Sequence, residues 1–104
     1  MIVTTMNDIP GKKVKEVIGV VRGNTVRSRN IGRDIMAGFK SLVGGEISTF
    51  TELINQSRDE AYNRMVNRAI EMGADAIIAM RFDASSIMQN SSEILAYGTA
   101  VKLN

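Results

Sequence analysis

Four arginines lie close together in the first half of the chain, in the stretch RGNTVRSRNIGR of residues 22–33, and no acid lies among them. Guanidinium groups suit phosphate and carboxylate, because each presents parallel N–H donors to two oxygens. The same groups can instead pair with carboxylates of this chain or of a neighbouring copy. The stretch therefore has three interpretations: a small-anion site, a nucleic-acid surface, or a charged contact within or between subunits.

The candidate ligand or interface residues end this stretch and open the next element. They are Arg27, Arg29, Asn30, Arg33 and Asp34. A helix that begins after Asn30 would add backbone N–H groups and the positive end of its dipole. The acids that could pair with the arginines are Asp34, Glu46, Asp59 and Glu60. We favour ion pairing at a subunit contact over binding of a small anion, and place nucleic acid last.

The composition excludes several kinds of site. The 104 residues include no Cys and no His, which removes thiol and histidine catalysis and the usual ligands of zinc, copper and haem. A hard-ion site from Asp34, Asp75 or Asp83 stays open, although these acids follow no EF-hand spacing. No glycine-rich phosphate-loop motif occurs. We predict no catalytic residue and name no cofactor; an enzyme acting on an anionic small molecule at the subunit interface is the alternative.

Charge is distributed unevenly along the chain. Residues 1–45 hold eight Lys or Arg and three acids, whereas residues 46–104 hold five and eight. The basic first half and the acidic second half suit a head-to-tail contact between copies. The length predicts a single domain over residues 1–104. The N-terminus lacks signal-peptide features and no apolar run has the length of a membrane span, so we expect a cytoplasmic protein.

The pattern of the N-terminal third predicts strands. A short strand is expected over residues 2–6 and a longer one over residues 12–23, where Gly19 indicates a bulge or a close approach of another backbone. A turn is expected at Gly23–Asn24, after which residues 25–28 would return as a short strand.

Two amphipathic helices are predicted next. Apolar residues recur at helical spacing over residues 31–43 and again over residues 48–72, where Gly73 supplies the stop. Thr49 and Glu52 have the spacing of a capping box at the start of the second helix. The other face of this helix is interpreted as a solvated or contact surface; it carries Arg58, Asp59, Glu60, Arg64, Arg68 and Glu71.

Two strands are predicted at the C-terminal end, over residues 74–85 and 94–103, joined by a polar loop. Alternation places Ile77 and Met80 on opposite faces of the first strand, and both faces are apolar enough to be covered. One face of the last strand carries mostly small residues, which fits close packing. The elements together predict an α+β two-layer sandwich, with helices against one face of a mostly antiparallel sheet.

Three blocks of the chain, residues 17–46, 57–83 and 94–103, resemble in the same order those of the YbjQ-like family, whose domain is labelled heavy-metal-binding. The resemblance implies a dodecin-like fold with a β-α-β-β core and a ring-shaped homopentamer whose neighbours are joined by short strands. Asn30, Arg33 and Asp34 match the family's polar trio. The glycines that match the family and are interpreted as structural are Gly44, Gly45, Gly73 and Gly98. We therefore expect an uncharacterised small homo-oligomer with a structural or small-ligand-binding role, and metal binding by label only.

Overall fold

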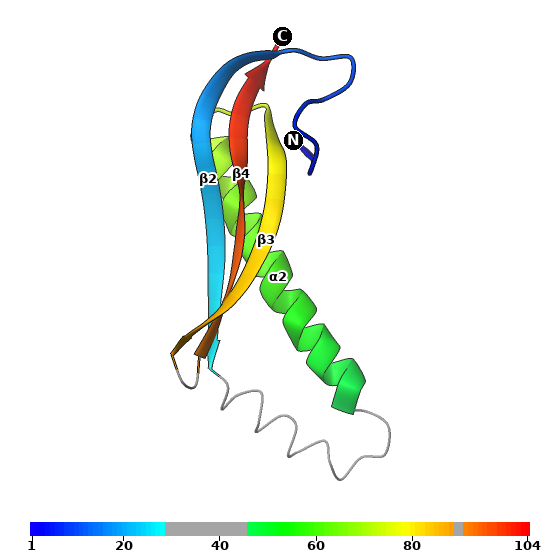
Figure 1. The fold of residues 1–104 in the computed structure, drawn as a ribbon, viewed down its shortest axis with the longest axis vertical. Helices are drawn as coiled ribbons and strands as arrows, with labels where there is room; N and C mark the ends of the chain where they lie inside the picture. The colour runs from blue at the N-terminus through cyan, green and yellow to red at the C-terminus, as the bar shows by residue number, and fades with distance from the viewer. Residues whose placement is uncertain (29–45, 89–90) are drawn as a thin grey trace.

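The computed structural model describes residues 1–28, 46–88 and 91–104. Its elements are β1 (Ile2–Val3), β2 (Val14–Ser28), α2 (Glu46–Glu71), β3 (Ala76–Met88) and β4 (Ser91–Leu103). The sheet has the order β1-β3-β4-β2 and is antiparallel except for the parallel pair β1 and β3. Helix α2 packs against one face of this sheet, mainly under β2 and β4 (Figure 1). The predicted α+β architecture with a mostly antiparallel sheet is confirmed; the helix expected at residues 31–43 lies outside the described residues.

Strand β2 runs without interruption through Gly23, so the turn and the short return strand predicted there are wrong. A Cβ atom at Gly23 would overlap the carbonyl oxygen of Ala61 and the amide nitrogen of Met65, and would lie 2.7 Å from the Cβ of Arg64. Gly23 therefore marks the point where the backbones of β2 and α2 cross in contact. A glycine needed for close approach has the same appearance in the sequence as a glycine in a turn.

A β-bulge in β3 changes which side chains reach the helix. The register with β4 shifts within residues 78–81, and Ala79 has a φ of 53°. Ile77 and Met80 consequently lie in the same core cluster under α2, and the prediction that they face opposite ways is wrong, because a bulge reverses the alternation beyond it. The bulge predicted at Gly19 is confirmed by a register shift in β2.

The main core lies between α2 and the small-residue face of β4. Ala96 and Ala100 are fully buried there, which confirms that this face packs closely. A Cβ atom at Gly98 would lie 2.6 Å from the Cγ2 atom of Ile77. The buried members of the core are Val21, Ala61, Met65, Ala69, Ile77, Met80, Ala96 and Ala100.

Strands β3 and β4 both extend into the segment that was predicted to be a loop. Pairs such as Ser85 with Glu93 and Ser86 with Ser92 continue the ladder through residues expected to form a polar loop. The predicted loop is therefore mostly strand. The serines do not themselves favour a strand, but strand propensity depends strongly on context, and pairing with the neighbouring strand outweighs it here.

The sequence predicts the C-terminal end of α2 correctly but not its N-terminal end. The helix begins at Glu46, earlier than the predicted capping box, which is therefore wrong. At its C-terminal end the N–H groups of Gly73 and Ala74 donate to the carbonyls of Ile70 and Ala69, both at 3.0 Å. Gly73 has a φ of 81°. This is the pair of bonds that ends a helix in a Schellman motif, and a glycine adopts the required left-handed conformation at little cost.

The sheet face opposite α2, here called the outer face, is covered at one end by the N-terminal segment. Ile9 packs there against Ala76 and Val101. Further along the same face, Val20 is 74% exposed and Tyr97 is 37% exposed. In the part of the chain that the structure describes, the helix covers one face and the outer face is left largely open.

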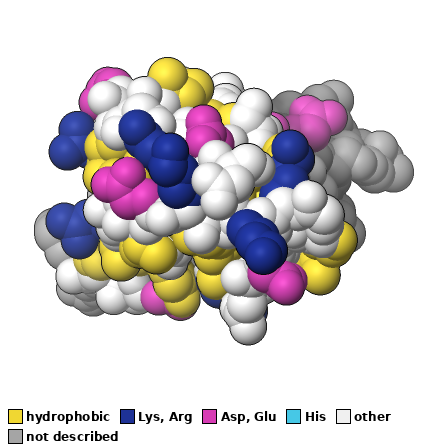
Figure 2. Space-filling view, turned by 90° about the horizontal axis from the view of Figure 1, so that it is seen from above, with side chains coloured by type: hydrophobic (Ala, Val, Ile, Leu, Met, Phe, Trp, Pro, Cys, Tyr) yellow, Lys and Arg dark blue, Asp and Glu magenta, His cyan; other side chains and the backbone are white. Residues whose placement is uncertain are grey.

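The basic first half and the acidic second half do not form separate ends of the described molecule. Strand β2, from the first half, pairs along its length with β4, from the second half. Figure 2 shows basic and acidic side chains interspersed on one surface. Within residues 1–28, 46–88 and 91–104, no helix combines the length and the apolar character needed to cross a membrane.

Candidate functional site

Arg27 is the one member of the predicted site that the structure describes, and it binds the helix of its own chain. Its Nε donates to Ser57 Oγ at 3.0 Å, and its Nη2 lies 2.9 Å from Glu60 Oε2. The side chains of Arg27 and Glu60 are about one third exposed, at 36% and 37%. The remaining members, Arg29, Asn30, Arg33 and Asp34, lie outside the described residues, as do the predicted structural glycines Gly44 and Gly45.

Arg27 belongs to a polar seam between β2 and α2, formed by Thr25, Arg27, Ser57 and Glu60. Thr25 is 3% exposed and donates from Oγ1 to the carbonyl oxygen of Ser57 at 2.9 Å. Thr25 and Arg27 lie on the same side of β2 because side chains alternate along a strand. The seam joins the strand to the helix beyond their crossing. It engages Arg27 with Glu60 of the same chain, whereas the favoured interpretation placed this pairing across a subunit contact.

Replacing Arg27 by methionine is expected to lower the free energy of unfolding by about 1 kcal/mol, because the hydrogen bond to Ser57 and a partly exposed ion pair with Glu60 are lost. Arg58→Met is the matched control, because Arg58 is exposed on α2 and lies outside the seam, and its expected effect is within about 0.5 kcal/mol. Urea unfolding followed by circular dichroism measures both. Equal losses in the two variants would contradict a structural role for Arg27.

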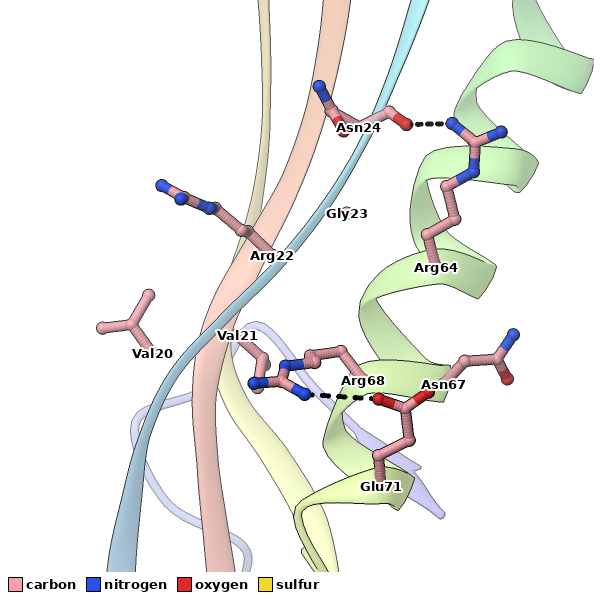
Figure 3. A pocket seen from close by; sticks show the side chains of 9 residues that line it. All are labelled: Val20, Val21, Arg22, Gly23, Asn24, Arg64, Asn67, Arg68 and Glu71. Carbon is pink, nitrogen blue, oxygen red and sulfur yellow. Dashed lines mark hydrogen bonds and ion pairs between the residues drawn. The ribbon is translucent and has the colours of Figure 1, made fainter.

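A second group of arginines lines a groove between the free edge of β2 and α2 (Figure 3). The groove has a volume of about 670 Å³. Its lining residues are Val20, Val21, Arg22, Gly23, Asn24, Arg64, Asn67, Arg68 and Glu71. Figure 3 shows the side chains of Val20 and Arg22 directed away from the helix, so the strand contributes mainly backbone and the helix supplies the charged side chains.

Two guanidinium groups form the helical wall of the groove. Arg64 donates from Nη1 to the carbonyl oxygen of Asn24 at 2.5 Å. Arg68 lies one helical turn further on, and its Nη1 is 3.3 Å from Glu71 Oε2. The sequence assigned both arginines to a solvated or contact surface. Their spacing of four residues places them on one helix face, but only the crossing at Gly23 puts a strand edge opposite them.

Of the carboxylates considered as hard-ion ligands, the two that the structure describes, Asp75 and Asp83, belong to no cluster of described acids. Asp75 accepts a hydrogen bond from the backbone N–H of Leu103 at 2.9 Å through Oδ2, and so joins the start of β3 to the end of β4. Asp83 lies on β3 opposite Leu95 of β4, and Asp34 is not among the described residues. Within the described ranges, no three acids are grouped so that they could hold a metal ion.

Comparison with known proteins decides the family. A family model described as "putative heavy-metal-binding" and named for YbjQ matches residues 1–104. The chain belongs to the YbjQ-like family. Uncharacterised relatives, each called a UPF0145 protein, match this YbjQ-like chain over 103 residues. That of Vibrio parahaemolyticus is 60% identical, covering 99% of this chain and 98% of the relative.

Two further relatives are similar to this YbjQ-like chain over nearly its whole length. The UPF0145 protein of Methanoculleus marisnigri is 57% identical, over 99% of this chain and 96% of its own. That of Thermotoga maritima is 53% identical, with coverage of 99% and 97%. The fold is similar to a crystal structure of a DUF74-family protein of unknown function from Pediococcus pentosaceus, with a TM-score of 0.65, 18% identity, and coverage of 100% of this chain and 98% of that one.

The metal label of the YbjQ-like family does not fit the residues of this member. Soft heavy metals prefer thiolate and imidazole ligands, and the chain has neither Cys nor His. The described acids also form no ligand cluster. No step of chemistry through a metal follows from this sequence.

Proposed function

We propose that the protein works as a homo-oligomer, with the pentameric ring that its family resemblance implies, in a structural or small-ligand-binding role. The observation that carries the proposal is the open outer face. Val17, Val20 and Val26 on β2 are 63%, 74% and 50% exposed. Their partners on β4 place all three on the same side of the sheet as Tyr97. Arg22 and Asn24 lie between Val20 and Val26 on this side. The exposed valines cost free energy that a second copy would recover, at about 25 cal/mol per Å² of apolar surface buried.

The shape of the chain supports the same conclusion. Its Cα radius of gyration is 17.1 Å, whereas a compact domain of this length has about 13 Å. A small elongated chain buries little surface within itself, and association is a common remedy. Arg22, Arg81, Asp83 and Glu93 add charges of both signs to the same face, and protein interfaces carry polar groups of this kind together with apolar ones.

Native mass spectrometry of protein purified without added metal or nucleotide tests the proposal. We expect five chains of 11.4 kDa. A monomer at micromolar concentration would contradict the oligomer, and another multiple would contradict the pentamer. Bare chains would leave the metal label without support, whereas mass lost on harsher activation would reveal a bound ligand.

We propose no catalytic role, and a cytoplasmic location remains part of this proposal.

A further inference from the structure

The floor of the groove is the free edge of β2. Because β2 is the last strand in the order β1-β3-β4-β2, one side of its backbone has no partner strand in the described part of the chain. The carbonyl of Asn24 points to this side, since it accepts a hydrogen bond from Arg64. Outward-pointing groups recur at every second residue of an antiparallel ladder. The N–H and C=O groups of Arg22 and Val20 therefore point into the groove as well.

The wall of the groove is more basic than acidic. Arg64 donates to a neutral carbonyl, which uses one of its five N–H donors. Among the residues that the structure describes, no carboxylate pairs with it. Arg68 pairs with Glu71, but the two side chains are 60% and 67% exposed. Ion pairs this exposed are worth at most about 1 kcal/mol. An incoming anion can therefore take the place of Glu71 at small cost.

We infer that this groove binds a small molecule carrying phosphate or carboxylate groups, held between Arg64 and Arg68 and within reach of the Arg22 backbone N–H. Guanidinium groups recognise both kinds of anion through paired N–H donors. The volume of about 670 Å³ lies in the range of small-molecule sites. An added polypeptide strand fits less well, because Arg64 already occupies the Asn24 carbonyl that the strand would need. Val20 and Arg22 contribute backbone to the groove, whereas their side chains are directed away from the helix, toward the outer face.

The test is a titration of the full-length protein with inorganic phosphate, citrate and AMP at fixed ionic strength, followed by amide chemical shifts and calorimetry. At least one anion should bind with a Kd below about 1 mM, with shifts concentrated in residues 20–24 and 64–71. Arg68→Met should weaken binding about tenfold by removing a charge-assisted contact. It leaves the Arg64 bond to β2 intact, so folding is preserved. Glu71→Gln should strengthen binding about threefold, since the competing carboxylate is lost.

Arg58→Met is the matched control, because Arg58 lies on the same helix outside the groove and is exposed. It should leave the affinity unchanged. Absence of shifts with all three anions at about 10 mM would overturn the inference. So would binding that Arg68→Met and Arg58→Met weaken equally, which would mean a general attraction to positive charge. Binding of an extended acidic peptide in the absence of binding by the three anions would instead indicate strand addition at β2.

Discussion

Gly23→Ala is expected to lower the free energy of unfolding by about 3 kcal/mol, the upper end of the cost of overpacking. The added methyl group would meet the backbone of α2 at Ala61 and Met65, and main-chain atoms cannot move aside as a flexible side chain can. For a domain of this length, the melting temperature should fall by more than about 10 °C. Thermal unfolding followed by circular dichroism measures the change.

Gly98→Ala is the comparison for this prediction. Its new methyl group would meet chiefly the Cγ2 atom of Ile77, with the nearest backbone atoms at 3.1 Å and 3.3 Å. A side chain can adjust, so the expected loss is smaller, about 1 kcal/mol. If Gly23→Ala were as stable as the unmodified protein, the close crossing of β2 and α2 would be contradicted.

Val20→Glu is expected to convert the assembled protein into single chains. Val20 is the most exposed apolar side chain of the outer face, at 74%. A carboxylate there costs the separate chain no more than about 1 kcal/mol, but it would be desolvated without a partner at an interface, at a cost of several kcal/mol per ion. Five copies would each carry this cost. Sedimentation velocity over a range of concentrations measures the dissociation.

Asn63→Asp is the matched control, since it adds the same charge at an exposed position of α2 and should leave the assembly intact. Dissociation by both variants would indicate an effect of net charge alone. An assembly that survives Val20→Glu would show that the outer face is not the contact surface. The apparent melting temperature of the unmodified protein should also rise with concentration, as mass action requires of an oligomer.

The sequence by itself determined which segments form the helical layer and which form the sheet. Alternating and helical periodicities identified the long helix, the C-terminal strands and the small face of β4, because each pattern reflects burial on one side of an element. Gly19 and Gly73 marked a bulge and a helix end, because their backbone conformations favour glycine. The lack of Cys and His likewise excludes a soft-metal site built from the side chains of this chain, since the ligands themselves are missing.

Only the tertiary structure decided what the glycines and arginines in β2 do. The residues around Gly23 have the pattern of a turn, yet Gly23 lies within a strand that α2 crosses. The crossing helix is distant in the sequence, so the residues next to Gly23 do not reveal it. The bulge at Ala79 has no glycine to announce it, so the faces of β3 were misassigned beyond it.

The same reason explains the candidate site. Arg27 was singled out for its local density of charge, but its partners, Ser57 and Glu60, were fixed by the packing of α2 on β2. Arg64 and Arg68 belong to a charged helix face of an ordinary kind. They became a candidate anion site because the fold places opposite them the edge of β2 that pairs with no other described strand. Periodicity reports burial and does not report which elements become neighbours.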